Sequence, residues 1–582
     1  MDIGAFYGKR ARAQTESSTD SSDVANISIS DNSDDEFRPM EEDDTSSSEN
    51  MSESSSDESD IEPTPPALIN IPNQQSVTPP LVWNENVTAR GQIAYVGNHG
   101  LKKIITHNDN SDVMPIEIFN QFFDEPIIEL FVVETNRYAQ QYVQSHQLRR
   151  TSRMKRWTDT TKEEMRKFLG VILLTGLIIY PNMEDYWKKD VLYYHPVFHQ
   201  IDMSYNRFAL LLKNWHCANN LDAQQNDRLH KISLFMKMLI TNIQSVYVPN
   251  CEISVDETMI SHRGRLLFRQ YNPGKAHKYG IKLFKLAEMS GYVWNFSVYC
   301  GKGTENTLPG LDHAGSIVVT LAESLLNEGR LLVADNWYSS IPLANYLKDK
   351  NTEYCGTVRS NRKGIPPEIK NAKLKKGEIK AAINQTGLRI MNYKDKKTVF
   401  MISTFHGPNC IETRKTTRDG DAILKPQVIL DYNRVKGGID LSDQLISYYS
   451  PARKSVKWYR KVIFECIGIV VLNSFVLYNK FYTRKPTQLA IFIKSIASSL
   501  LQVPANVIDK PTKKAHELRD IPRKANGKIV RKRCSNCYEK KSRTSGRKEA
   551  SLKCKQVHTE CLECQKPFCL QCFNNVHENN PK

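Results

Sequence analysis

Long apolar runs are scarce in this chain of 582 residues. Two runs come nearest, residues 168–181 and 462–478, and both are shorter than the roughly 20 apolar residues that a membrane span needs. The second run also contains Glu465 and Asn473. The N-terminus is polar and acidic, which excludes a secretory signal. We therefore expect a soluble, intracellular protein with no membrane partner, in which both runs are buried core helices.

Cysteine is sparse over the first 533 residues, where only six of the 13 cysteines are found, each on its own. Scattered cysteines in a reducing compartment are usually inert core residues, and we expect that here. The other seven lie together between Cys534 and Cys572. Such clustering indicates a metal site.

Large apolar residues are also rare in residues 1–85, which are rich in Ser, Asp and Glu. A segment of this kind buries too little surface to offset the entropy lost on ordering, so we predict a disordered acidic tail. Residues 1–62 carry 18 acidic and 4 basic residues, whereas the remainder carries 46 acidic and 76 basic. A basic body with an acidic tail indicates a polyanionic partner such as nucleic acid; the alternative is a well-solvated surface.

The body of the chain changes texture along its length. Residues 112–250 carry apolar groups at helical spacing, and residues 252–340 contain short apolar strands with one helix before the last. A lysine-rich, strand-like region follows at 350–430, and helices return after Asp440. This order predicts a multidomain fold of α/β plus α type.

Carboxylates occur at the ends of two predicted strands. One strand runs into Asp256 and another ends at Asp335. Gly437–Gly438 should break the preceding segment, placing Asp440 near the start of a helix and Asp443 on the same face one turn later. Each acid alone could be a cap or turn residue, but convergent carboxylates repel unless they hold hard cations. The pattern predicts two Mg²⁺ (or Mn²⁺) ions acting on a phosphodiester.

Basic and aromatic residues interleave shortly after Asp256. Lys and Arg neutralise phosphates, and aromatic rings stack on unpaired bases, so we favour contact with DNA. The alternative is a solvated strand face with Phe268 and Tyr271 buried. Residues 359–364 and 453–461 have a similar composition. The candidate DNA-binding residues are Arg263, Arg265, Arg269, Lys275, Lys278 and Lys282.

The cysteine cluster has the spacing of zinc ligands. Its members are Cys534, Cys537, Cys561, Cys564, Cys569, Cys572 and His577. Two tetrahedral Zn²⁺ sites need eight ligands. Cys554 or His558 could supply the eighth, or both could bind and His577 be omitted. A redox-active or disulfide cluster is the remaining alternative.

Several long motifs together resemble those of the piggyBac family of DDE transposases. They are "SVDETMI", "RGRLLFRQYNPGKAHKYGIK", "VADNWYSS", "GTVRSNRKGIP", "YNRVKGGIDLSDQ", "YYSPARKSVKWYRKV" and the terminal "CxxCFxxxH". The resemblance runs in the family's order from about residue 110 to the end of the sequence. It implies that Asp256, Asp335 and Asp440 are the catalytic triad and metal ligands, and that Asp443 is a further functional acid.

The resemblance also implies an architecture. It would comprise an RNase H-like catalytic core with an insertion domain, a helical domain for dimerisation and DNA binding, and a C-terminal cross-braced zinc finger. A nuclear localisation signal is expected in the basic linker, where the residues alone also fit a phosphate-binding arm. The implied boundaries are 252–361 and 427–449 for the core, 362–426 for the insertion, 106–251 and 450–510 for the helical domain, 511–533 for the linker and 534–582 for the zinc finger.

The function implied is cut-and-paste DNA transposition in the nucleus. A homodimer would bind the terminal inverted repeats of double-stranded transposon DNA, cut through hairpin intermediates and insert at TTAA. One alternative is a domesticated DNA- or chromatin-binding protein that no longer cuts, and another is a metal-dependent nuclease without strand transfer. The intact acidic triad favours the transposase.

Overall fold

The computed structural model describes most of the chain after residue 80. The described parts are 81–105, 112–273, 278–301, 307–416, 422–453, 455–503, 518–524, 527–562 and 564–577. Most of the predicted acidic tail, residues 1–80, lies outside them. The structure differs from the expected tail boundary at residues 81–85, because β1 (Trp83–Asn84) pairs antiparallel with β10 (Ile379–Asn384) at a sheet edge.

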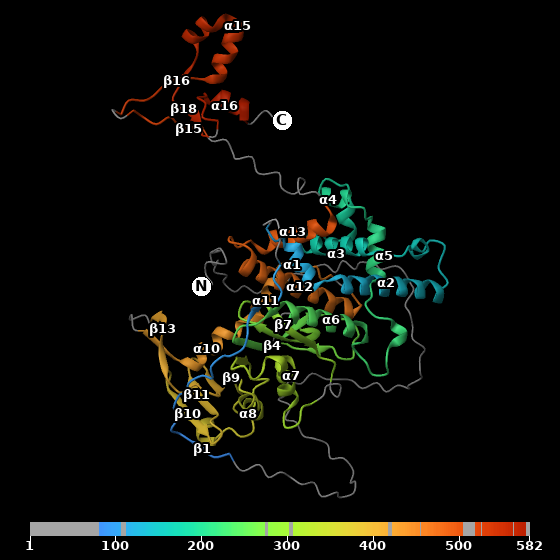
Figure 1. Cartoon of the computed structure of the whole chain (residues 1–582), viewed down its shortest axis with the longest axis vertical. Coiled ribbons are helices and arrows are strands. Elements are labelled where there is room, and N and C mark those ends of the chain that lie inside the picture. The colour runs from blue at the N-terminus through green and yellow to red at the C-terminus, as the bar shows by residue number, and fades with distance from the viewer. Residues whose placement is uncertain are drawn as a thin grey trace, which may run out of the picture. The chain divides into compact units, whose positions relative to one another are not determined.

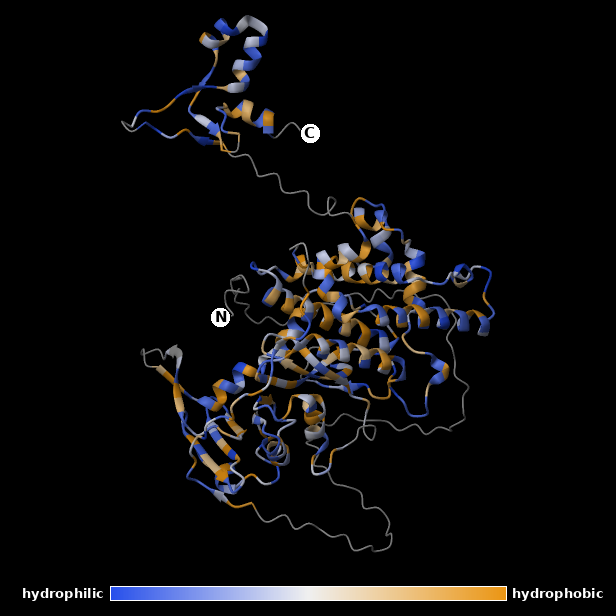
Figure 2. Ribbon diagram, viewed as in Figure 1, coloured by the Kyte–Doolittle hydropathy of each residue, from blue (hydrophilic) through white to orange (hydrophobic). Residues whose placement is uncertain are grey.

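Helices dominate both ends of the body, as the apolar spacing predicted (Figure 1). α3 and α13 pack closely against each other, and Figure 2 shows apolar residues concentrated where these helices meet. The helices of this layer are α1 (Pro115–Phe122), α2 (Glu125–Ser145), α3 (Lys162–Leu177), α4 (Pro196–Gln200), α5 (Tyr205–Asn214), α6 (His230–Val246), α12 (Trp458–Leu477) and α13 (Leu489–Leu501).

α12 is apolar around its whole circumference and forms the centre of the helical layer. In the part of the chain that the structure describes, the segment 458–482 is the one helix long and apolar enough to cross a membrane. Of its apolar 18-residue stretch, 78% is buried. Asn473 shows why it is a core helix. Its side chain donates to the carbonyl oxygen of Val293 at 2.7 Å and accepts from the Val293 amide at 2.9 Å, which ties α12 to a strand.

The central strands follow the order β7-β6-β4-β8-β9. β4 pairs antiparallel with β6 and parallel with β8, and β8 pairs parallel with β9. α11 (Gly437–Tyr448) and α12 contact β4, whereas α7 (His313–Ala322) contacts β6 and β7 and α8 (Ile341–Asp349) contacts β9. The strands are β4 (Glu252–Ser261), β5 (Gln270–Tyr271), β6 (Tyr279–Glu288), β7 (Val293–Val298), β8 (Leu331–Ala334) and β9 (Glu353–Thr357).

Most strands of the expected insertion, residues 362–426, continue the same sheet, and the other two form a two-stranded sheet of their own. β12 pairs antiparallel with β9, so the ladder runs from the central strands into the insertion without interruption. Its elements are α9 (Pro367–Lys370), β10, β11 (Arg389–Lys394), β12 (Thr398–Ser403) and the hairpin of β13 (Cys410–Thr416) and β14 (Ala422–Pro426).

The preceding helix ends just before Gly437 and Gly438, and a new helix begins there, as the sequence predicted. α10 (Gln427–Val435) is followed directly by α11, whose first two residues are these glycines. Close packing also requires glycine here, because a Cβ on Gly438 would lie 2.4 Å from the carbonyl oxygen of Glu288. Glycine therefore lets α11 lie directly on β6.

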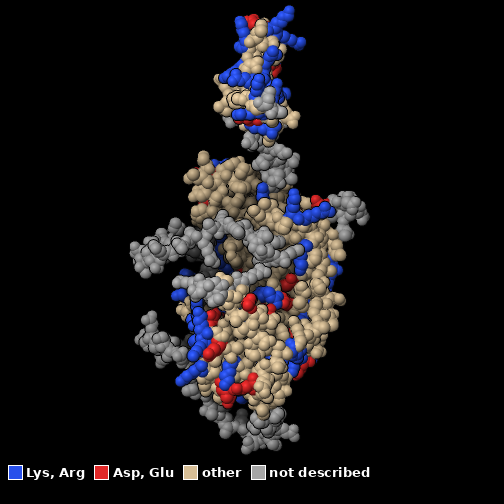
Figure 3. All heavy atoms as spheres, turned by 90° about the vertical axis from the view of Figure 1, so that its left-hand side faces the viewer, with Lys and Arg blue, Asp and Glu red and all other residues tan. Residues whose placement is uncertain are grey.

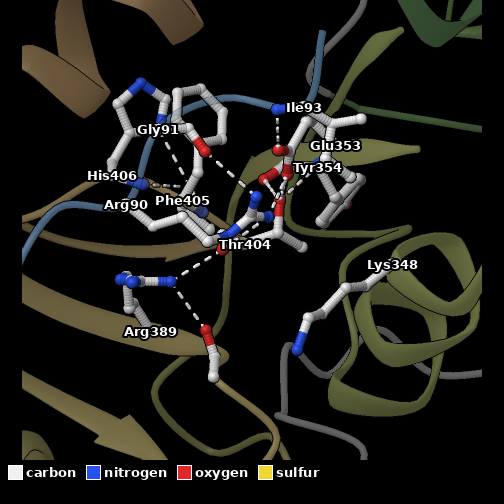
Figure 4. A network of polar contacts seen from close by, with 12 residues as sticks. Arg90, Gly91, Ile93, Lys348, Glu353, Tyr354, Arg389, Thr404, Phe405 and His406 are labelled. Carbon is white, nitrogen blue, oxygen red and sulfur yellow. Dashed lines mark hydrogen bonds and ion pairs between the residues drawn. The ribbon is translucent and has the colours of Figure 1, made fainter. Parts of the chain in front are cut away.

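Residues 81–105 cross the sheet and are fastened by a buried carboxylate, Glu353 (Figure 4). Glu353 pairs with Arg90 at 2.9 Å and accepts hydrogen bonds from the amide of Ile93, at 2.8 Å, and the hydroxyl of Thr404. Arg389 donates to the Thr404 carbonyl at 2.7 Å. The network joins the N-terminal segment to β9 and to the end of β12.

The C-terminal module has a core of its own. Its small core is made of cysteines with Val557, Phe568 and Phe573. Residues 518–577 contain 15 Lys and Arg against 5 Asp and Glu, and Figure 3 shows basic side chains over its visible surface. Its elements are β15 (Leu518–Asp520), β16 (Lys532–Arg533), α15 (Ser535–Lys553, kinked at Gly546), β17 (Gln556–Val557), β18 (Thr559–Cys561) and α16 (Leu570–His577).

Glu353→Ala should lower the free energy of unfolding by about 3 kcal/mol, because it leaves the donors of Arg90, Ile93 and Thr404 without their acceptor. Urea denaturation followed by circular dichroism measures the change. Glu85→Ala is the matched control, since Glu85 pairs with Lys380 at 2.8 Å but its side chain is 62% exposed. Equal effects of the two substitutions would contradict a fastening role for Glu353.

Candidate active site

The sheet register brings Asp256 and Asp335 next to each other. Val255 pairs with Ala334 in the parallel ladder of β4 and β8, and the next residue on each strand is the aspartate. The Asp335 carboxylate accepts a hydrogen bond from the Trp337 amide at 2.8 Å. Two carboxylates thus occupy neighbouring strands at the point where the parallel pairing ends.

A third acid, Glu257, and a buried tyrosine lie at this end of the sheet. The Tyr338 hydroxyl donates to Glu257 at 3.2 Å, and burial together with Glu257, Asp256 and Asp335 raises the pKa of Tyr338 well above its ordinary value. Burial also raises the pKa of Asp335; the Trp337 amide opposes this and Glu257 adds to it. Asp335 is thus a partly buried carboxylate, and such a group is a suitable ligand for a hard cation.

α11 places Asp443 on the face of β4 that also carries Asp256. Asp443 accepts from the Thr258 hydroxyl, at 2.7 Å to one oxygen and 2.9 Å to the other, and Thr258 lies two residues beyond Asp256 on the strand. Asp440 is exposed and lies one helical turn before Asp443, as predicted. The structure therefore brings all four acids to one region, held by β4, β8 and α11.

The triad acids are not gathered as closely as ligands of one ion. Within the described parts of the chain, groups of three or more His, Cys, Asp or Glu with ligand atoms within 4.8 Å of one another occur only in the C-terminal module. The acids nevertheless fit Mg²⁺ or Mn²⁺ by chemistry, because all donors are carboxylate oxygens.

A buried lysine holds the helix that carries Asp440. Lys285 is fully buried on β6, opposite Asp256 in the ladder, and its ammonium contacts Asp443 at 2.9 Å and Glu465 at 2.8 Å. Burial alone would lower the pKa of Lys285, but Glu465 and Asp443 outweigh it and raise the pKa above its ordinary value. The raised pKa means that the lysine stabilises the fold at neutral pH and loses this effect only at strongly alkaline pH.

The basic stretch after β4 lies mainly at the surface. Phe268 is buried, whereas Tyr271 is 57% exposed, so the solvated-face interpretation is right for one aromatic residue and wrong for the other. Lys282 is largely buried and lies 4.0 Å above the Trp337 ring, beside Glu257. Lys275 lies outside the described residues. Contact with DNA stays a prediction for Arg263, Arg265, Arg269 and Lys278, all of which are exposed.

The cysteine-rich module contains two candidate metal groups. One consists of Cys534, Cys537, Cys569 and Cys572, and the other of Cys561, Cys564 and His577. The first has the four thiols of a structural Zn²⁺ site, and the amide of Cys569 also donates to the Cys534 sulfur at 3.3 Å. The two groups alternate along the chain.

The structure places Cys554 and His558 outside both groups. The Cys554 thiol lies 3.5 Å from the Cys534 carbonyl oxygen, and His558 lies 3.5 Å from Asp520. The geometry therefore favours the ligand sets that include His577 and leaves the second group with three ligands among the described residues.

Comparison with known proteins decides the family. A family model described as Transposase IS4 matches residues 114–475. Human PiggyBac transposable element-derived protein 3 is 27% identical over 478 residues, which cover 78% of each chain. Human PiggyBac transposable element-derived protein 2 is 26% identical over 411 residues, covering 68% of this chain and 66% of the relative. The chain belongs to the piggyBac family of transposases.

The fold agrees with this membership. A cryo-EM structure of a piggyBac transposase synaptic complex with hairpin DNA matches 82% of this chain and 98% of that one, with a TM-score of 0.59 and 24% identity. At this identity the match shows the fold alone.

Three residues that hold Asp443 in place, directly or through Lys285, escaped the sequence analysis. Thr258, Lys285 and Glu465 orient Asp443, yet none stands in the acidic pattern. A signal was present, because Glu465 is a charged residue in an apolar run and Lys285 lies among the apolar residues of a strand. Such charges are rarely buried unless they are paired.

Lys285→Met should destabilise the protein by about 3–5 kcal/mol, because it leaves Asp443 and Glu465 facing each other without a cation. Urea denaturation checks the stability. Lys237→Met, on the exposed face of α6, is the control and should change little. A Lys285→Met protein as stable as the control would show that the ion pairs do not hold α11.

We also expect two Zn²⁺ ions per chain, measured by elemental analysis of the purified protein. Cys572→Ser should remove one ion, because it leaves three thiols in the first group. Cys554→Ser should keep both, since Cys554 lies in neither group. Loss of zinc from Cys554→Ser would contradict this assignment, and a single ion in the unaltered chain would contradict the two-site arrangement.

Proposed function

We propose that the chain is an active cut-and-paste DNA transposase that excises transposon DNA and inserts it at TTAA targets. The observation that carries the proposal is the adjacency of Asp256 and Asp335 on parallel strands, with α11 carrying Asp440 and Asp443 against the same sheet. Membership in the piggyBac family supports the reaction class.

The catalytic core proposed is RNase H-like. The order β7-β6-β4-β8-β9, with three antiparallel strands followed by two parallel ones, supports this. Asp256, Asp335 and Asp440 would hold two Mg²⁺ or Mn²⁺ ions, which supply activation of the attacking oxygen and stabilisation of the leaving oxygen. The triad would place these charges at one phosphodiester.

The chain's other residues position this triad. Asp443 accepts three contacts from Thr258 and Lys285, so its role is to orient α11 and, through it, Asp440. The exposed arginines that follow β4 would neutralise the DNA backbone. No protein nucleophile is required, because water and then a DNA 3′-OH attack phosphorus.

The proposed sequence of steps begins with hydrolysis that nicks each transposon end. The freed 3′-OH attacks the opposite strand and makes a hairpin, which is reopened. The 3′-OH then attacks the TTAA target. The proposed assembly is a homodimer on double-stranded terminal inverted repeats in the nucleus, with the helical domain and the cross-braced zinc finger binding DNA. The basic surface of the C-terminal module supports this.

A domesticated DNA-binding protein that no longer cuts is the second candidate. It is favoured by the human relatives, whose names describe them as derived from transposable elements. The intact triad of this chain favours cleavage. The two candidates differ in one measurable property, which is whether the protein cuts the DNA that it binds. A metal-dependent nuclease would cut without transferring the strand to TTAA.

Asp→Asn substitution at Asp256, Asp335 or Asp440 should lower Mg²⁺-dependent cleavage of transposon ends by at least about 1,000-fold while DNA binding survives, because one metal ligand is lost. Gel assays of cleavage and target joining give both readouts. Asp349→Asn, at an exposed helix end, should cleave normally. Near-normal cleavage by any one triad variant removes that residue from the triad. Binding without cleavage by the unaltered chain would support the domesticated protein instead.

A further inference from the structure

A cluster of cations lies where the beginning of α12 meets α2, α5 and α6, away from the carboxylates. We call it the basic cluster. It consists of Lys213 at the end of α5, Lys231 on α6, and Lys457 and Arg460 at the beginning of α12. The first two are far from the others in sequence, so only the fold brings them together.

Tyrosines hold these cations in place. The Lys457 ammonium lies 3.4 Å from the Tyr138 hydroxyl and 5.3 Å from the centre of its ring. The Lys231 ammonium lies 5.3 Å from the centre of the Tyr459 ring. Arg460 donates to the carbonyl oxygen of Lys213 at 2.5 Å. The cations are therefore fixed by aromatic rings and a backbone oxygen.

Lys457 and Arg460 pair with no carboxylate among the residues that the structure describes. Arg460 is only 8% exposed, and its Nε makes no hydrogen bond within the parts of the chain described. The charged groups that act on Lys457 there are all cations, namely Arg460, Lys231 and Lys213. The twenty-residue helix α12 also directs its positive N-terminal end here, and Lys457 forms no side-chain cap.

Such an arrangement costs stability in the free protein. Burial, together with the three neighbouring cations, lowers the pKa of Lys457 to about 7. Burial, with Arg460, lowers the pKa of Lys231 as well. Four other titratable groups of the described residues also face the cluster: Tyr138, Tyr142, Tyr459 and His216. Burial holds the pKa of His216 well below its ordinary value, which keeps this ring neutral. An anion would relieve this repulsion.

We propose that the basic cluster seats a backbone phosphate of bound DNA. The inference rests on the proposed function, since it names a contact that DNA would make with the helical layer. A phosphodiester suits the cluster because it carries one negative charge and accepts hydrogen bonds from Arg and Lys and at a helix N-terminus. Arg453, from the same sequence motif, instead bonds the Tyr180 carbonyl oxygen at 3.1 Å and serves the fold.

Proton uptake should accompany occupation of this seat. A phosphate beside Lys457 favours the charged ammonium and so raises its pKa above the free value near 7. DNA binding then takes up a proton over the range from about pH 7 upwards, and affinity falls as pH rises, by at most about tenfold per pH unit for one proton. Below pH 7 the lysine is already protonated and the dependence disappears.

The test measures DNA affinity of the full chain between pH 6.5 and 8.5, without added Mg²⁺, for the unaltered protein, Lys457→Arg and Lys457→Met. The unaltered chain should bind up to about tenfold more weakly for each pH unit above 7. Lys457→Arg should keep the affinity seen at low pH and lose the pH dependence. Lys457→Met should bind weakly at every pH, with a salt dependence smaller by about 0.9 in log–log slope, as expected for one lost phosphate contact.

Lys237→Met, on the exposed face of α6, is the matched control and should leave the pH and salt dependence unchanged. Equal pH slopes for the unaltered chain and Lys457→Arg would overturn the proposal. Arg keeps the charge, so this comparison stands even if Lys457→Met fails to fold. If a peptide of residues 1–62, and not DNA, bound in a Lys457-dependent manner, the cluster would be a docking site for the acidic tail and the proposal would be wrong. Failure of all forms to bind DNA would refute the proposed function as well. Normal cleavage of transposon ends, together with a DNA affinity that does not depend on Lys457, would refute the phosphate site alone.

Discussion

The buried ammonium of Lys285 is the interaction on which the candidate active site depends. It joins a strand that lies beside Asp256, the helix that carries Asp440, and α12, the centre of the helical layer. A lone buried charge is costly, so the lysine and its two carboxylates are stable only together. The helix that carries Asp440 and the helical layer are therefore held in one arrangement through a single side chain.

The sequence was sufficient to predict the parts of the site that depend on local patterns. Asp335 follows β8 and Asp440 lies near the start of α11, and these placements could be read from alternation and spacing. Asp256 lies in the middle of β4, so its predicted place at a strand end was wrong. The cysteine spacing likewise predicted a cluster. The ligand set of each zinc site was harder to predict. Which pairs of cysteines share a metal ion depends on how β18 and α16 fold back, and the spacing alone does not determine this.

Contacts between distant segments escaped prediction for a physical reason. The break at Gly437 and Gly438 was predicted because glycine is a poor helix former. The sequence did not show that Gly438 is also required by close approach to the Glu288 carbonyl oxygen. The pairing of β12 with β9, and of β1 with β10, joins segments whose alternation shows only that they are strands. Local propensity identifies an element, whereas tertiary packing selects its neighbour.

The uninterrupted hydrogen-bonded ladder from β4 through β8 and β9 into β12 has a mechanical meaning. A hinge between strands β4, β8 and β9 and the insertion would have to break the hydrogen bonds between β9 and β12. The two regions therefore move as one rigid body and unfold in one cooperative step. Any opening that admits or releases a bulky ligand must come from the loops at the strand ends or from the helical layer.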